Sequence, residues 1–116
     1  MTTCPFCDLI ADGGGEWSNN NAVAFGDRFP VSVGHTLVVP RRHHGDLFAL
    51  DAAVRAAVWA LVDEVRDALA ADGAPDGFNA GINVGEAACQ TIDHAHVHVI
   101  PRYTSDVLDR AGVCAG

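Results

Sequence analysis

Residues 94–102 read His-Ala-His-Val-His-Val-Ile-Pro-Arg, and no other stretch of the chain constrains its structure as strongly. Three histidines alternate with small apolar residues, and the run is short and rich in β-branched side chains, which favours a strand over a helix. Side chains on a strand alternate between its two faces. The histidines therefore share one face, roughly 7 Å apart, and the apolar residues share the other. This pattern predicts a row of imidazoles against which an extended anion can lie.

The length and composition favour one globular domain. A chain of 116 residues, 49% of them hydrophobic, is long enough for one core but not for two, and too apolar to be disordered. We expect a single domain over residues 1–116, with its core at about 4–103 and a short irregular tail. No apolar run approaches the roughly 20 residues of a membrane span, and the N-terminus has no signal-peptide pattern. We therefore expect a cytoplasmic protein without membrane contact.

The net charge of the chain limits the classes of ligand that it can bind. A net charge of −8 argues against a general nucleic-acid binder, which normally presents a basic face, but it does not exclude a small phosphorylated ligand. All seven basic residues are arginine. Without lysine there is no Schiff-base chemistry through a lysine side chain and no GxxxxGK[ST] phosphate loop. If the ligand carries a phosphate, histidine, arginine, hydroxyl and backbone N–H groups would have to bind it.

The order of the expected elements indicates an antiparallel α+β domain. A long helix over about Asp51–Ala71 is the best-supported element, with Asp51 as N-cap and Gly73 as the C′ residue. Its apolar residues recur at three- and four-residue steps. They are Val54, Val58, Leu61, Val62, Val65 and Leu69. Strands are expected at 22–25, 35–40 and 78–84 besides the histidine strand, with a short helical turn over 4–10 and a special backbone angle at Gly34.

Histidines and cysteines in this arrangement permit a metal site. Three histidines on a strand face are a familiar set for zinc, although no HExxH helix motif is present. Separately, Cys4 and Cys7, with one histidine near residue 43 and another near residue 94, would make a tetrahedral Cys₂His₂ site. A redox pair or a merely buried pair remains the alternative for the two cysteines. A disulfide framework is not expected in a reducing cytosol. The position of Cys114 indicates no function.

The same histidines permit nucleophilic catalysis. A neutral imidazole attacks phosphorus if one ring nitrogen is free and the other donates a hydrogen bond that fixes the tautomer. Neighbouring histidines can stabilise the charge that builds on the transferred phosphoryl group. His96 is flanked by a histidine on either side and is the natural nucleophile.

Two blocks of sequence resemble the histidine triad (HIT) family. One runs from Gly81 to Arg102 and contains the His-x-His-x-His run; the other is Gly34-His35-Thr36-Leu37-Val38-Val39-Pro40-Arg41-Arg42-His43. With the Cys-Pro-Phe-Cys start and the central helix, the resemblance covers residues 4 to about 103. It implies an α+β, HIT-like fold: an antiparallel sheet of about five strands, one long central helix and a short N-terminal helix. It also implies a homodimer that acts on purine nucleotides through a nucleotidyl-histidine intermediate.

The resemblance assigns roles to individual residues. It gives His96 as the nucleophile, His98 as the contact to the phosphate and leaving group, and His94 as a supporting residue. The residues matching the family's nucleotide contacts are Asp27, Asn83, Gln90, Thr91, Phe6 and Leu9. Relatives with the N-terminal CxxC bind zinc, and the matching ligands here are Cys4, Cys7, His43 and His94. No organic cofactor is implied.

Several residues have an alternative reading or depart from the family pattern. His35 is expected to be structural, His44 solvated, and Asp27 a turn residue as readily as a ribose contact. Arg102 either steers phosphate or ends its strand in solvent. Cys89 occupies a position where the family commonly has glycine, and its Cβ would cost stability if φ is positive there. The tail after Tyr103 is short.

Two function classes therefore remain open. The first is an enzyme that hydrolyses or transfers nucleotides at the α-phosphate, from dinucleoside polyphosphates or nucleoside phosphoramidates. The second is a non-catalytic, zinc-stabilised dimer that binds nucleotides for regulation. His96 and His98 favour the enzyme, because a pure binder needs no nucleophile.

Overall fold

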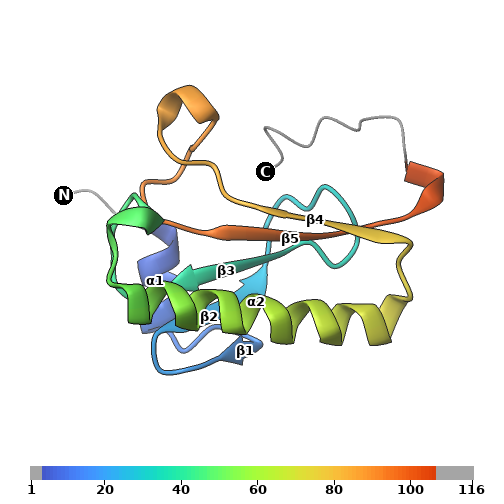
Figure 1. Cartoon of the computed structure of the whole chain (residues 1–116), viewed down its shortest axis with the longest axis horizontal. Helices are drawn as coiled ribbons and strands as arrows, with labels where there is room; N and C mark the ends of the chain where they lie inside the picture. Colours follow the sequence, from blue (N-terminus) through green and yellow to red (C-terminus); the bar gives the residue numbers. More distant parts are fainter. Residues whose placement is uncertain (1–3, 107–116) are drawn as a thin grey trace.

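A long helix lies across one face of a five-stranded antiparallel sheet in the computed structural model, which describes residues 4–106 (Figure 1). The strand order is β1-β2-β3-β5-β4, and every neighbouring pair is antiparallel. The helices are α1 Pro5–Ala11 and α2 Ala52–Gly73, and the strands are β1 Trp17–Ser18, β2 Ala22–Gly26, β3 Thr36–Pro40, β4 Gly77–Gly81 and β5 Val97–Arg102. Two short 3-10 turns, η1 Leu47–Ala49 and η2 Glu86–Ala88, lie in the connections, and a third, η3 Thr104–Asp106, follows β5. The expected α+β class and antiparallel sheet are confirmed.

The sheet has an apolar cluster on each face. Towards α2, small and β-branched strand residues such as Ala24, Val38 and Val97 pack on Leu61 and Val65. On the opposite face Phe6 of α1 packs on alternate strand residues, namely Val23, Phe25, Leu37 and Val39. Both faces of the central strands are therefore buried, which explains why β3 reads as an unbroken apolar run.

The histidine stretch keeps its predicted alternation but not its predicted strand length. Ala95, Val97 and Val99 belong to the cluster under α2, and the three histidines lie on the other face beside Phe6. The strand itself begins only at Val97, because the last pair with β3 is Val38 with Val97. The amide of Ala95 instead donates to the carbonyl of His44 at 2.6 Å.

Two further boundaries differ from expectation. β4 ends at Gly81 rather than residue 84. The left-handed residue after α2 is Ala74, at φ 46°, and Gly73 is the last helical residue. Asp51 occupies the N-cap position, as predicted, but its side chain makes no cap hydrogen bond. Gly34 has φ 92°, as its expected special role requires.

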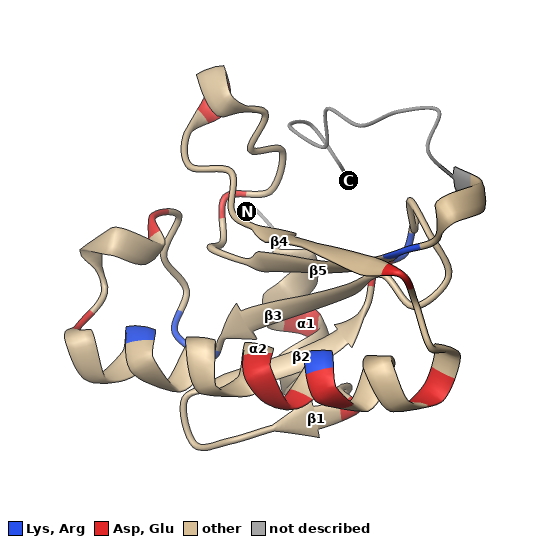
Figure 2. Cartoon of the chain, turned by 45° about the vertical axis from the view of Figure 1, so that its right-hand side comes forward, with Lys and Arg blue, Asp and Glu red and all other residues tan. Residues whose placement is uncertain are grey.

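Charged side chains are spread over several elements (Figure 2). Acidic positions lie along α2 and in the surrounding loops, and arginines lie on α2, after β3 and at the end of β5. No helix between residues 4 and 106 is both long and apolar enough to cross a membrane. Of the irregular tail expected after about residue 103, residues 104–106 form the 3-10 turn η3, and the rest, with Cys114, falls outside the described residues.

Candidate functional site

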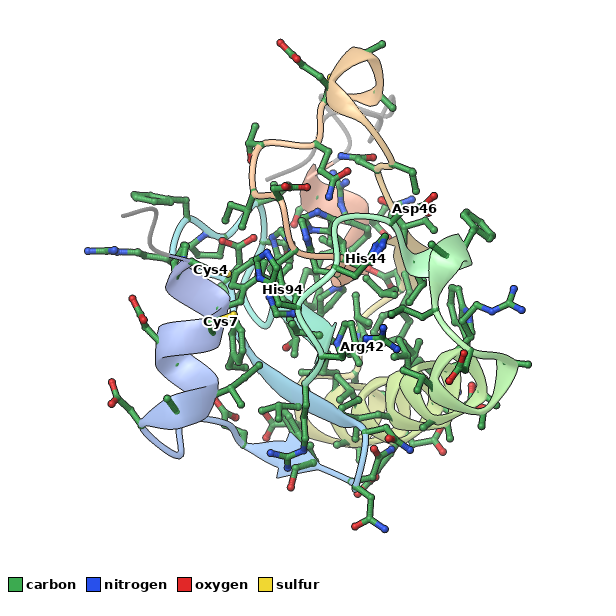
Figure 3. The ribbon with its side chains drawn as sticks, turned by 90° about the vertical axis from the view of Figure 1, so that its left-hand side faces the viewer. Cys4, Cys7, Arg42, His44, Asp46 and His94 are labelled. Atoms are coloured by element: carbon green, nitrogen blue, oxygen red, sulfur yellow. The ribbon has the colours of Figure 1, made fainter. Side chains whose placement is uncertain are left out.

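Two cysteines and two histidines from three parts of the chain meet at the N-terminus of α1. Figure 3 shows three of them, Cys4, Cys7 and His94, side by side. Cys4 is the N-cap of α1 and Cys7 lies in its first turn, while His43 follows β3 and His94 precedes β5. The Nδ1 atom of His94 lies 3.3 Å from Cys4 Sγ and 3.6 Å from Cys7 Sγ, and His43 Nδ1 lies 3.2 Å from Cys7 Sγ. All four potential ligand atoms lie within 4.8 Å of one another. The fold thus brings together the four residues that the resemblance gave as zinc ligands.

The hydrogen bonding of His94 suits a metal ligand. Its Nε2 lies 2.8 Å from the carbonyl oxygen of Pro40, which can only accept, so Nε2 carries the proton. Nδ1 therefore presents its lone pair to the two thiols, as metal-binding histidines do. The pKa of the Cys7 thiol is raised, mainly by burial and to a smaller extent by the neighbouring Cys4. Two thiolates side by side are therefore unfavourable without a counter-charge, and a divalent cation would supply it.

His96 has the hydrogen bonding of a nucleophile. Its Nδ1 lies 2.8 Å from the carbonyl oxygen of His94, so Nδ1 donates and Nε2 keeps a free lone pair. Its ring is 5.1 Å from that of Phe6 and 5.0 Å from that of His98, and only 6% of the residue is exposed. Burial lowers the pKa of His96, so the imidazole is neutral and nucleophilic at neutral pH.

His98 is linked to a fourth histidine that precedes β3. Its Nδ1 lies 2.9 Å from Nε2 of His35, which in turn lies 3.3 Å from the carboxylate of Asp27. Burial, together with the neighbouring His96 and His35, lowers the pKa of His98 to about 4. His98 is therefore neutral at neutral pH and can donate or accept a hydrogen bond.

A cavity of about 760 Å³ opens in front of His96 and His98. One part of its wall is apolar, with Phe6 and Leu9 from α1 and Phe25 from β2; Asp27 and Thr91 supply polar groups. A volume of this order suits a mononucleotide-sized ligand. Four of the six predicted nucleotide contacts, Asp27, Thr91, Phe6 and Leu9, therefore share a cavity with both histidines.

The other two predicted contacts do not line this cavity. Gln90 holds the loop before β5: its Oε1 accepts from the Gly85 amide at 2.7 Å, and its Nε2 donates to the carbonyls of Gly45 and Ile92 at 2.8 and 3.1 Å. Asn83 follows β4 and is not among the residues lining the cavity. It lies two residues beyond Gly81, the β4 residue that pairs with His98.

Some features were misjudged or missed from the sequence. His35 is 2% exposed and bonded to His98, so it belongs to the site; its place in the block with Pro40 and His43 was the available signal. His44, expected in solvent, is half-buried and accepts from the Asp46 amide at 3.0 Å. Arg102 donates to Asn79 of β4 at 3.0 Å. Cys89 has φ 70°, a conformation that favours glycine.

Comparison with known proteins places the chain in a family. Residues 17–105 match the model of the HIT domain. A HIT family protein of known structure from Bacillus anthracis is 38% identical, with a TM-score of 0.83 over 90% of this chain and 76% of that one. A Zn-bound histidine triad family protein from Mycobacterium smegmatis is 33% identical, with a TM-score of 0.83 over 92% and 80%.

A curated relative carries an activity in its name. The adenylylsulfatase HINT3 of Arabidopsis thaliana is 33% identical over 111 residues, which are 90% of this chain and 55% of the relative. The family model covers most of the chain, and the solved relatives share its sheet and helices. The chain therefore belongs to the histidine triad (HIT) family.

Proposed function

We propose that this protein is a nucleotide hydrolase or transferase that forms a covalent nucleotidyl intermediate on His96. The observation that carries the proposal is the 2.8 Å contact between His96 Nδ1 and the His94 carbonyl, which leaves Nε2 as a bare lone pair beside the cavity. Membership of the HIT family and the adenylylsulfatase relative support this class of reaction.

The reaction follows from the two histidines that line the cavity. Nε2 of His96 attacks the α-phosphorus, a phosphorus–nitrogen bond forms, and the bond to the leaving group breaks with its electron pair going to the leaving group. His98, neutral and adjacent, stabilises the oxygens of the transferring group by hydrogen bonding. Water then attacks the same phosphorus, the phosphorus–nitrogen bond breaks with its electron pair returning to Nε2 of His96, and the proton of the water passes to solvent. The nucleotide is released and His96 returns to its starting state.

The walls of the cavity suggest how the nucleotide lies. Phe6, Leu9 and Phe25 offer an apolar surface for a purine base. Asp27 offers carboxylate oxygens for ribose hydroxyls, and Thr91 offers a hydroxyl to the phosphate. The α-phosphate would then face His96. Substrates with an activated α-phosphate fit this placement: dinucleoside polyphosphates, nucleoside phosphoramidates or an adenylyl sulfate.

We further propose that Cys4, Cys7, His43 and His94 bind zinc. The lone pair of His94 Nδ1 faces both thiols, and a structurally similar family member is Zn-bound. Four protein ligands fill a tetrahedral site, so the zinc would be structural. When bound, it would tie α1 to the residue whose carbonyl holds His96. Metal analysis checks this: Cys4→Ser should abolish stoichiometric zinc, and unchanged metal content would remove Cys4 from the site.

We propose a homodimer as the assembly, as the family resemblance implies. β4 lies at one end of the strand order and pairs only with β5 among the described strands. Helix α2, which precedes β4 in the chain, leaves Trp59 44% exposed. An unpaired strand edge and an exposed tryptophan are features that association would cover. Light scattering after size exclusion should give twice the chain mass, and a monomer at micromolar concentration would contradict the proposal.

The decisive experiment compares substrates and variants. The protein is incubated with diadenosine polyphosphates, adenosine phosphoramidate and adenylyl sulfate, and AMP release is measured for the wild type, His96→Ala and His44→Ala. We expect His96→Ala to lose roughly 10⁴-fold or more, and His44→Ala, outside the cavity, to retain turnover. A base-quenched reaction should show the adenylyl adduct by mass spectrometry. Turnover that survives His96→Ala would overturn the mechanism, and binding without turnover by the wild type would indicate a regulatory binder.

A further inference from the structure

A chain of hydrogen bonds leads from the loop between β2 and β3 to His98. The backbone amide of Val31 lies 3.0 Å from Nδ1 of His35. Because a backbone N–H can only donate, Nδ1 of His35 must accept. Burial lowers the pKa of His35, so the ring is neutral and its single proton lies on Nε2.

The next bond determines the state of His98. Nε2 of His35 lies 2.9 Å from Nδ1 of His98. With the proton on the His35 side, Nδ1 of His98 accepts, and the proton of neutral His98 must lie on its Nε2. If the proton of His35 were on Nδ1 instead, that N–H would point at the N–H of Val31, and neither could accept. This assignment would also set a bare His35 Nε2 against the Asp27 carboxylate at 3.3 Å.

The donor at the end of this chain has no partner in the protein. Nε2 of His98 is buried and lacks a hydrogen-bond partner among the described residues. Leaving a buried donor unpaired is unfavourable, and in native proteins such groups are rare. His98 lines the cavity with His96. An oxygen of a ligand in that cavity would satisfy the unpaired N–H.

We propose that His35 is a positioning residue that holds His98 in the Nε2–H tautomer, with the Val31 amide as its anchor. This inference rests on the proposed function in one respect: the identity of the ligand atom that His98 contacts, a phosphoryl or leaving-group oxygen. His96 and His98 then hold opposite tautomers. His96 has a bare Nε2 for attack, and His98 has an Nε2–H for stabilising the departing or transferring oxygen.

A metal ion shared by Asp27, His35 and His98 is the competing explanation, since their donor atoms also lie within 4.8 Å of one another. Two nitrogens on one tetrahedral zinc lie about 3.3 Å apart, given Zn–N distances of about 2.0–2.1 Å. The two ring nitrogens here are 2.9 Å apart, which is a hydrogen-bond distance. In addition, a metal bound to Nε2 of His35 would leave neither ring nitrogen protonated, because Nδ1 already accepts from the Val31 amide.

The test is ¹⁵N NMR of the histidine ring nitrogens at neutral pH. The chain has six histidines, and the His98 signals are assigned from their absence in His98→Asn. In the wild type, His98 should show a protonated Nε2 and a bare Nδ1. In His35→Leu, which can neither accept from Val31 nor donate to His98, the proton should redistribute between the two nitrogens. His35→Gln, whose carboxamide both accepts and donates, should restore the wild-type pattern.

Turnover provides the second measurement. His35→Leu should lower kcat by roughly 10- to 1,000-fold with a smaller change in KM, because a wrong tautomer weakens the transition state more than binding. His35→Gln should recover most of the loss. If the leucine variant does not fold, His35→Asn replaces it, since its shorter side chain can accept from Val31 but stops short of His98.

The outcomes separate the two proposals. A protonated Nδ1 on His98 in the wild type, or His98 signals unchanged in His35→Leu, would overturn the positioning role whatever the turnover. Shifts of the His98 signals on adding stoichiometric zinc to the zinc-loaded protein would favour the metal instead. If no nucleotide is turned over but the tautomer depends on His35 as described, the positioning role stands and the proposed reaction fails.

Discussion

His96 and His98 are neighbouring imidazoles whose Nδ1 atoms meet different groups. The Nδ1 of His96 meets a carbonyl, which forces it to donate, and that of His98 meets another imidazole. The two rings lie 5.0 Å apart in an edge-to-face arrangement, and both are 6% exposed. Their chemical difference therefore comes from their hydrogen-bond partners rather than from their burial.

Burial of His98 predicts a loss of stability in acid. Its pKa is about 4 in the folded protein and about 6.5 in an unfolded chain. Between these values the unfolded state binds more protons, so the free energy of unfolding falls as the pH decreases from about 6.5 to about 4. His98 alone should contribute on the order of 3 kcal/mol across this window.

Urea unfolding between pH 7 and pH 4 measures this dependence. His98→Asn should show a shallower fall than the wild type. The pKa values of His35, His94 and His96 are also lowered by burial, so the variant retains part of the slope. Equal slopes for the two proteins would show that His98 is not held neutral by the fold.

The end of helix α2 illustrates what a helical pattern does and does not reveal. The three- and four-residue spacing locates the helix within one or two residues, and Val58, Leu61, Val62 and Val65 are buried as predicted. The pattern could not say which residue takes the left-handed conformation, because the helix continues through Gly73 and leaves Ala74 at φ 46°. That choice depends on the route of the chain into β4.

Ala74→Gly should therefore stabilise the protein. A left-handed conformation costs an alanine about 1–2 kcal/mol, and the greater unfolded freedom of glycine returns about 0.4–1 kcal/mol of that. We expect a net gain of roughly 0.5–1 kcal/mol in urea unfolding. Ala60→Gly, an exposed site in the helix interior, is the matched control and should lose about 1 kcal/mol. A loss at both positions would contradict the cap assignment.

The loop before β5 depends on Gln90 for its shape. All three hydrogen bonds of the side chain go to the backbone, at Gly85, Gly45 and Ile92. Gln90→Ala should destabilise the protein by about 1–3 kcal/mol and speed amide exchange at Gly85 before any nucleotide is added. Gln90→Glu keeps an acceptor for Gly85 and loses the two donors, so exchange at Gly85 should stay slow. If Gln90 acted only as a nucleotide ligand, exchange in the free protein would be the same in all three.

Alternation along the histidine strand was predictable because the two faces follow from backbone geometry alone. The start of that strand at Val97 was not, because it depends on where β3 stops pairing and on the His44 carbonyl that takes the Ala95 amide. The four cysteine and histidine ligands were given by resemblance to the family. The role of His35 was missed, since it depends on an amide in an irregular loop, at Val31, that no periodicity locates.

At the scale of the whole molecule, α1 joins two parts of the proposed machinery. The helix has only seven residues, too few to be stable alone. Its buried side chain Phe6 packs beneath the sheet and beside His96, while Leu9 lines the cavity. Cys4 and Cys7 stand next to His94. Whatever holds α1 to the sheet therefore also shapes the wall of the cavity.

If zinc binds the four ligands, removing it should affect both stability and nucleotide binding. A ligand that binds only the folded state stabilises it by RT ln(1 + [L]/Kd), and structural zinc sites bind strongly. We expect a chelator to lower Tm by several degrees or more, and to weaken the binding of AMP, the proposed product. Cys4→Ser/Cys7→Ser is the control: its Tm should start lower and not respond to the chelator. Equal melting of the wild type with and without chelator, in a sample shown to have lost its metal, would mean that α1 is held by Phe6 and its apolar neighbours alone.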